Sequence, residues 1–225
     1  MTGNLGGTMI KILSKMILKI SAPIYNRFYR KNNKQQDITF LSNNCIGGVL
    51  YHMLGLPFSS PTINMFIEDE CFVKLAEDPR HYFSIDAQPY EENHIDYVGE
   101  DLLTYPIIKV DDILLCCQHY KSCSEAVDAW NRRRHRVNFD KLYVICCTWN
   151  LHEREDLVER ISKIPYPSVI FTTKDFKYKN CLKLNQAFYK EDIRGVIRPN
   201  LTSFKGVIGK RYFVDEFDFI QWINT

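Results

Sequence analysis

Hydrophobic and polar positions change period most clearly within residues 37–58. Residues 38–41 form a short run of β-branched and aromatic side chains, which is typical of a buried strand. The polar stretch 42–44 interrupts this run with Ser and Asn side chains that bond nearby backbone and favour turns. From Ile46 the apolar residues recur at helical spacing until Gly55, which we expect to end the helix in a left-handed conformation. The pattern therefore predicts a strand, a polar turn and a helix, in that order.

Beyond residue 58 the pattern predicts strands that alternate with helices. Runs with strand character occupy residues 82–86, 102–110, 113–119, 142–147, 168–172 and 182–184, and the second and third of these are expected to pair as a hairpin with residues 111–112 as the turn. Helical spacing occupies residues 64–75, a stretch that follows Ser122, and residues 153–164 and 213–223, whereas residues 88–97 are expected to form an acidic surface loop. Because 142–147 and 168–172 are apolar throughout, we expect an α/β fold, a three-layer sandwich with a mainly parallel central sheet flanked by helices. The sheet and its helices should form a single domain over residues 37–225.

Residues 1–36 form a separate basic segment. Residues 9–24 are apolar, with lysines at helical spacing, and more basic residues follow: Lys11, Lys15, Lys19, Arg27, Arg30, Lys31 and Lys34. A basic amphipathic helix of this kind is typical of a peripheral anchor on an anionic inner-membrane surface, here through residues 9–34. A helix packed on the domain, or a frayed leader, is the alternative. The interior lysines and the lack of a small-residue cleavage site argue against a signal peptide, so we expect a cytoplasmic protein.

Composition excludes several classes of protein. A net charge of +2 argues against a general nucleic-acid binder. No stretch has the ~18 uninterrupted apolar residues that a membrane span needs. Four of the eight cysteines form two adjacent pairs in predicted strands, where neighbours point to opposite faces, so free thiols in a reducing compartment are favoured over disulfides. The cysteines and histidines lack the spacing of zinc ligands, so we expect no metal site. No glycine-rich nucleotide-binding motif is present either.

The turn at residues 43–45 carries the candidate chemistry. Ligands of parallel α/β sheets bind at the carboxyl ends of strands. Three stretches follow predicted strands and therefore lie at such ends: this turn, the stretch after His119, and residues 148–150. A thiol at a helix N-terminus meets the positive end of the helix dipole, which stabilises a thiolate, so Cys45 is predicted to be a nucleophile. A small buried hydrophobic residue is the alternative. His119 is the best candidate base, and His94 in the expected acidic loop is a further candidate. His52 lies ~10 Å further along the same helix as Cys45 and is expected to have a supporting role.

Other residues near this turn are expected to bind substrate. One of Asn43 and Asn44 should cap the helix, and the other is a candidate donor to an oxyanion. Two early helical glycines allow close approach either of a ligand or of a packed neighbour, and the sequence favours neither. The complete set of expected substrate-binding residues is Asn43, Asn44, Gly47, Gly48, His52, Ser60 and Arg211.

Four longer stretches of the sequence resemble one bacterial family. They are SNNCIGGVLYHMLGLPFSSPTINMFI, HYKSCSEAVDAWNRRRHRVN, VIFTTKD and GKRYFVDEFDFIQW. The family is an exopolysaccharide and capsule biosynthesis family known as a domain of unknown function, and the resemblance runs over residues 38–222. The chain departs from it after Val144, where CCTWNLHERED replaces an acidic, glycine-containing stretch. The resemblance implies a role in making or decorating surface polysaccharide.

The arrangement of strand, Asn-Cys and helix is also similar to that of capsule-polysaccharide acyltransferases related to the SGNH-hydrolase type. This resemblance implies that Cys45 is the nucleophile, that Asn43 or Asn44 binds the oxyanion, and that His119 is the base. We therefore expect a transferase that moves an acyl group to a polysaccharide precursor, with acyl-CoA as the candidate cofactor. A glycosyltransferase that uses a nucleotide sugar and a non-catalytic, membrane-associated assembly protein are the alternatives.

Overall fold

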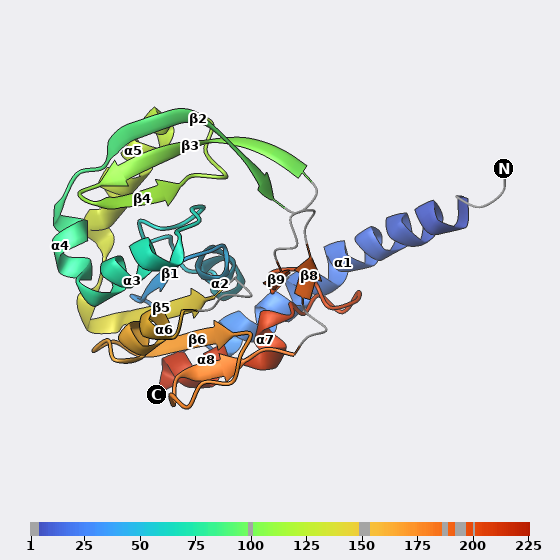
Figure 1. The fold of residues 1–225 in the computed structure, drawn as a ribbon. Helices are drawn as coiled ribbons and strands as arrows, with labels where there is room; N and C mark the ends of the chain where they lie inside the picture. The colour runs from blue at the N-terminus through green and yellow to red at the C-terminus, as the bar shows by residue number, and fades with distance from the viewer. Residues whose placement is uncertain (1–4, 99–100, 149–153, 186–188, 192–196, 200) are drawn as a thin grey trace.

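The computed structural model describes residues 5–98, 101–148, 154–185, 189–191, 197–199 and 201–225 (Figure 1). Within these ranges the chain is a mixed α/β protein with a four-stranded parallel sheet, a three-stranded antiparallel sheet and eight α-helices. The parallel sheet has the strand order β1-β5-β6-β7, where the strands are Thr39–Ser42, Leu142–Cys147, Ser168–Thr172 and Cys181–Lys183. The predicted strand 182–184 is therefore found one residue earlier.

Both faces of the parallel sheet are buried, as the apolar strands predict. Phe40, Ile145 and Phe171 pack on one face against α2 (Ile46–Leu54), α7 (Phe213–Glu216) and α8 (Phe219–Asn224). Their chain neighbours Leu41, Val144 and Ile170 pack on the opposite face against α3 (Asp69–Glu77) and α6 (Glu155–Ser162). Neighbouring residues in a strand point to opposite faces, so uninterrupted apolar runs are what a sheet covered on both sides requires.

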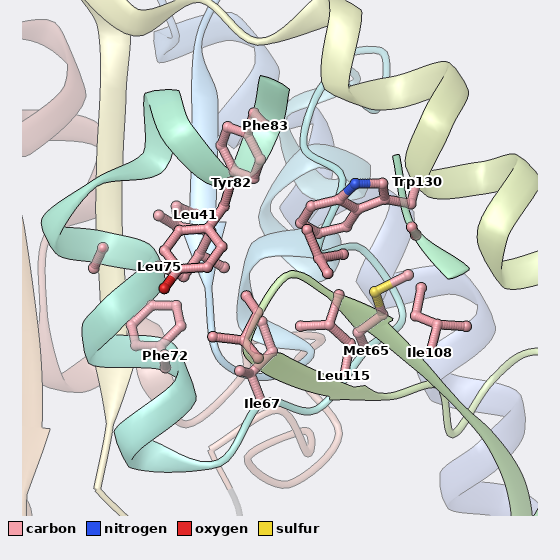
Figure 2. Close-up of a cluster of buried hydrophobic side chains, with 14 of the residues drawn as sticks. Leu41, Met65, Ile67, Phe72, Leu75, Tyr82, Phe83, Ile108, Leu115 and Trp130 are labelled. Atoms are coloured by element: carbon pink, nitrogen blue, oxygen red, sulfur yellow. The ribbon is translucent and has the colours of Figure 1, made fainter. Parts of the chain in front are cut away.

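The second sheet is antiparallel, which corrects the expectation of one mainly parallel sheet. It consists of β2 (Gln88–Val98), β3 (Asp101–Val110) and β4 (Ile113–Cys116). Figure 2 shows its core residues Ile108 and Leu115 in one cluster with Leu41 of the parallel sheet and Phe72 of α3. The two sheets therefore share one hydrophobic core.

Strand β2 replaces the acidic loop that we expected over residues 88–97. Its side chains are mostly exposed, and the pairing with β3 shifts register on both sides of Glu91. Because the side chains of β2 are mostly exposed, its sequence need not alternate between apolar and polar residues. Its strand structure comes from hydrogen bonds to β3, which is apolar and easy to detect from the sequence.

Three other predicted elements differ from the structure in their start, their type or their continuity. The helix expected over 64–75 begins only at Asp69, because Asn64 adopts a left-handed backbone with φ 65°. The strand expected over 82–86 is instead helix α4 (Pro79–Ser84), in which Pro79 starts the helix and the Asp78 side chain accepts a hydrogen bond from the backbone N–H of His81. The helix expected over 213–223 is interrupted at Phe217, whose backbone is extended.

The remaining elements surround this core. Helix α5 (Cys123–Arg133) is capped by Ser122, as predicted, and short 3-10 helices follow at Arg134–Arg136 and Phe139–Lys141. Strands β8 (Tyr189–Glu191) and β9 (Ile197–Pro199) form a two-stranded sheet. Helix α1 (Leu5–Asn32) is longer than predicted, and its N-terminal half projects away from the rest of the molecule (Figure 1). No helix within the described residues has the length and hydropathy needed to cross a bilayer.

Candidate active site at the start of helix α2

The polar turn between β1 and α2 is built by its two asparagines. The side-chain oxygen of Asn44 accepts a hydrogen bond of 2.9 Å from the backbone N–H of Ile46, the first residue of α2. One of the four N–H groups that a helix start leaves without an intrahelical partner is thereby satisfied. Cys45 stands directly at this start with φ −69° and ψ −9°, and its side chain is half-buried. At the other end, Gly55 ends α2 with φ 70°, as predicted.

His119 lies beside Cys45, as the prediction of a nucleophile and its base requires. The Cys45 Sγ and His119 Nε2 atoms are 3.4 Å apart, within hydrogen-bonding distance for sulfur. Each residue follows a strand of a different sheet. Cys45 lies between β1 of the parallel sheet and α2, and His119 lies in the turn after β4 of the antiparallel sheet. The predicted strand 113–119 ends at Cys116, which leaves His119 free of the sheet and exposed.

A backbone pair holds the two sheets together at this point. The N–H of Phe66 donates to the carbonyl of Cys116 at 2.8 Å, and the N–H of Cys116 donates to the carbonyl of Phe66 at 2.9 Å. The loop after α2 is therefore fixed to the end of β4. This pair and the hydrogen bond of 2.8 Å from the Tyr120 hydroxyl to the Ile63 carbonyl hold the turn of His119 near the start of α2.

A cavity of about 370 Å³ opens beside this pair. Cys45 lines the cavity at the start of α2. Gly48, Val49 and His52 follow it by three, four and seven residues, so they line the cavity from the same face of the helix. Residues from other segments complete the lining: Phe58, Asn64, His119 and Arg211. The cavity thus brings together five of the residues that the sequence singled out: Cys45, Gly48, His52, His119 and Arg211.

Burial raises the pKa of the Cys45 thiol. This is the opposite of the direction expected from a helix N-terminus, because burial removes the solvation that stabilises the thiolate. The thiol therefore keeps its proton near neutral pH, and it needs a base to become a nucleophile. His119 Nε2 is placed to accept that proton.

Arg211 supplies positive charge to the cavity. Its Nη1 donates to the carbonyl oxygen of Thr202, and its guanidinium lies 4.2 Å from the centroid of the Phe204 ring. Burial lowers the pKa of this guanidinium, although an arginine stays charged at neutral pH. Among the described residues no carboxylate forms an ion pair with it. A half-buried cation without a carboxylate partner is suited to a phosphate or carboxylate group of a ligand.

The sequence was compared with known proteins. The model of the family described as "Domain of unknown function (DUF1919)" matches residues 16–224. The chain belongs to the DUF1919 family. A relative from Haemophilus influenzae, described as "Uncharacterized protein", is 27% identical over 204 residues, which cover 88% of this chain and 90% of the relative. The family is thus a domain of unknown function, as the resemblance implied, but neither description mentions polysaccharide.

Four residues expected to bind substrate in this DUF1919 domain lie outside the cavity lining: Asn43, Asn44, Gly47 and Ser60. Asn43 is fully buried, and its amide bonds the backbone of Cys147 twice, as donor to the carbonyl at 2.9 Å and as acceptor from the N–H at 3.0 Å. Ser60 is also fully buried and pairs with Thr62 at 3.1 Å. Gly47 faces β1, where an added Cβ would lie 3.0 Å from the Cβ of Ser42.

The structure therefore separates the two asparagines and the two glycines by role. Asn43 connects the ends of β1 and β5, Asn44 caps α2 while 7% exposed, and Gly47 allows tight packing of helix on strand. Gly48 lines the cavity instead, and a Cβ there would meet only ordinary contacts, the nearest at 3.7 Å. Residues 149 and 150 of the predicted strand-end stretch 148–150 lie outside the described residues.

Sequence reasoning missed three residues of the cavity. Val49 belongs to the apolar stripe of α2 and was assigned to the core, and Phe58 follows the helix as an exposed aromatic residue. Asn64 had a signal that we did not use. It follows the Pro61 turn, and Asn is one of the few residues that tolerate a left-handed backbone, which often marks functional loops.

Proposed function

We propose that this DUF1919 chain is a thiol-dependent transferase that moves an acyl group onto a polysaccharide precursor. The observation that supports this proposal best is the 3.4 Å contact between Cys45 Sγ and His119 Nε2 at the edge of a cavity. A cysteine next to a histidine base is the arrangement that covalent acyl transfer requires. The alternative glycosyltransferase gives this contact no role, so we do not pursue it.

The proposed reaction has two halves. Cys45 Sγ attacks the carbonyl carbon of the acyl donor while its proton passes to His119 Nε2. The donor's leaving group then departs with that proton, and the acyl group remains on sulfur as a thioester. In the second half, a hydroxyl of the acceptor attacks the thioester carbonyl and gives its proton to His119. The Cys45 thiolate leaves as an ester forms, and it regains the proton from His119.

The start of α2 provides a place for the oxyanion that each half forms. The N–H groups of the first helical turn have no intrahelical acceptor, and Gly48, the third residue of that turn, lines the cavity. Helix N-termini stabilise negative charge through these groups and through the helix dipole. We assign Gly48 N–H as the main donor, because the N–H of Ile46 is already bonded to Asn44.

The residues that line the cavity indicate the class of substrate. Arg211 fits an anionic group, such as a phosphate of acyl-CoA or a charged group of the acceptor. The exposed Phe58 and His52 add surfaces on which a sugar ring or an acyl chain can pack. The assignment of a polysaccharide precursor as acceptor depends on the sequence resemblance alone.

The proposal is tested by acylation of the full chain with p-nitrophenyl acetate and with acetyl-CoA. Peptide mass spectrometry then locates the acetyl group. We expect it on Cys45 of the wild type, and we expect Cys45→Ala to carry none there. His119→Gln should acylate at least tenfold more slowly near neutral pH, because general-base catalysis contributes on the order of 10²–10⁴. The half-buried Cys71 serves as an internal control, because no histidine among the described residues is hydrogen-bonded to it.

Alkylation with iodoacetamide tests separately whether the Cys45 thiol is accessible. If iodoacetamide modifies Cys45 but neither acyl donor does, the thiol is accessible and the proposed transferase chemistry is wrong. If Cys45 and Cys71 acylate at equal rates and His119→Gln changes neither, the pair has no catalytic role.

A further inference from the structure

Helix α1 presents a long apolar face to solvent. Seven large hydrophobic side chains between residues 12 and 28 are exposed, with Ile20 at 69% and Ile24 at 66%. The other members of this apolar stripe are Ile12, Leu13, Met16, Ile17 and Phe28. Contiguous exposed apolar surface of this kind marks an interaction site more often than a chance feature.

The stripe faces away from the rest of the molecule. At 3.6 residues per turn its members recur three and four residues apart, so they occupy one side of the helix. The opposite side holds Tyr29, which is 6% exposed and belongs to the core around α2, and the half-buried Tyr25. On the same side the Ser21 hydroxyl donates to the carbonyl of Val207. The helix is therefore attached along one side and unpartnered along the other within the described residues.

The charge of the residues around the apolar stripe indicates which kind of partner can cover it. Residues 1–36 contain seven of the chain's 29 Lys and Arg residues and none of its 27 Asp and Glu residues. This segment therefore carries +7, whereas residues 37–225 carry −5 at neutral pH. Lys15 and Lys19 flank one edge of the stripe and are exposed, and Arg27 and Lys31 continue it toward the body.

We propose that α1 lies on the surface of a bilayer that contains anionic phospholipids. The stripe enters the boundary between headgroups and acyl chains, and the basic side chains meet the lipid phosphates. A second copy of the chain is a poorer occupant, because pairing two stripes brings one +7 segment against another. A membrane span is excluded for this helix by its hydropathy.

The docked helix places the cavity near the bilayer. A Cβ on Gly209 would come within 2.6 Å of the Ala22 backbone of α1, so the turn before Arg211 packs directly on the helix. Arg30 of α1 also donates to the carbonyl of His52. If the proposed function holds, the acceptor or donor is then one that resides at a membrane surface, such as a lipid-linked precursor. This last step rests on the proposed function, whereas the docking itself does not.

Vesicle co-sedimentation of the full chain tests the docking. The probes are vesicles of phosphatidylcholine alone and of phosphatidylcholine mixed with phosphatidylglycerol. We expect at least tenfold tighter binding to the anionic vesicles, and weaker binding at high salt. The double variant Ile20→Asp/Ile24→Asp should lose at least tenfold in affinity, and Lys15→Gln/Lys19→Gln should lose several-fold.

A matched control uses the same chemical change elsewhere. Ile95 and Leu102 are exposed on the β2–β3 hairpin at 62% and 58%, so Ile95→Asp/Leu102→Asp introduces the same charge without touching α1. We expect this variant to bind like the wild type. Circular dichroism confirms that each variant is folded, and acetylation of Cys45 by soluble p-nitrophenyl acetate should be unchanged in all of them.

Two results would overturn the proposal. One is equal binding, or no binding, to both kinds of vesicle by the folded wild type. The other is a dimer in sedimentation velocity without lipid that Ile20→Asp/Ile24→Asp dissociates, which would assign the stripe to a second copy of the chain. Loss of vesicle binding with normal acetylation, or the reverse, separates this proposal from the proposed function.

Discussion

At the scale of single residues, Cys45 shows both the reach of local reasoning and its limit. Its place between a strand and a helix follows from the residue types around it, and the structure confirms that place. The direction of its pKa shift does not follow, because burial depends on residues distant in the sequence. Asn43 and Asn44 are adjacent and chemically identical, yet one connects two strands and the other caps a helix.

Asn43 gives a prediction of stability. Asn43→Ala removes both hydrogen bonds to the Cys147 backbone in a fully buried place, and buried polar groups that lose their partners cost about 1–3 kcal/mol each. We expect the free energy of unfolding in urea to fall by about 2–3 kcal/mol.

The matched control for this change is Asn64→Gly, at an exposed position where φ is 65° and glycine is unstrained. It should change the unfolding free energy by less than about 0.5 kcal/mol. An Asn43→Ala variant as stable as the wild type but unable to acylate Cys45 would show that Asn43 acts on the substrate instead.

At the scale of elements, α2 was predicted well because its signals are local. The apolar spacing, the preceding turn and Gly55 all act within a few residues. Strand β2 was missed because nothing within its own sequence requires it to be a strand, and only its pairing with β3 does. Elements whose structure is set by a distant partner are the ones that periodicity cannot detect.

The two glycines at the start of α2 allow a paired test. Gly47→Ala places a methyl group 3.0 Å from the Ser42 Cβ, which is anchored to a buried strand, so the strand or the helix must shift. We expect the unfolding free energy to fall by about 1–2 kcal/mol, the usual cost of overpacking.

Gly48→Ala meets contacts no closer than 3.7 Å and should leave stability equal or raise it by up to about 1 kcal/mol, because alanine favours helix. Since Gly48 lines the cavity, the same variant should slow the acetylation of Cys45, which peptide mass spectrometry measures. The reverse pattern, with Gly48→Ala the less stable variant, would contradict the separate roles that we assign to the two glycines.

At the scale of the whole molecule, two sheets with one shared core place the site. Cys45 follows β1 of the parallel sheet and His119 follows β4 of the antiparallel sheet, and the backbone pair between Phe66 and Cys116 links the loop after α2 to the end of β4. The same dense core buries many thiols and phenols. All eight cysteines are free, and five of them are buried.

Because of these buried groups, the free energy of unfolding is expected to change with pH in the alkaline range. Burial raises the pKa of Cys116 to about 12 and that of Tyr51 to about 12, and it also raises the pKa of Cys117. In the unfolded chain cysteines lose their protons near pH 8.5. The folded chain then holds protons that the unfolded chain releases, so the stabilisation is complete below about pH 8.5 and declines as the pH rises toward the folded-state values.

Urea unfolding under reducing conditions measures this decline. Each such group contributes a slope of about 1.4 kcal/mol per pH unit above the unfolded pKa. Cys117→Ala removes one fully buried thiol and should make the slope shallower by about that amount, whatever its effect at neutral pH. A free energy of unfolding that stays constant, or rises, between neutral and alkaline pH would contradict the prediction.

The sequence by itself determined the buried strands of the parallel sheet, the strand–turn–helix unit around Cys45 and the basic apolar helix over residues 9–24. These features depend on periodicity, on turn-forming side chains and on the spacing of residue types, which are properties of short segments. Only the tertiary structure decided that the antiparallel strands form a sheet of their own, that His119 lies beside Cys45, that Asn43 and Ser60 lie outside the cavity, and that Asn64 lines it. The physical reason is that sheet pairing, burial and the meeting of distant loops are set by long-range contacts, for which a short stretch of sequence carries no signal.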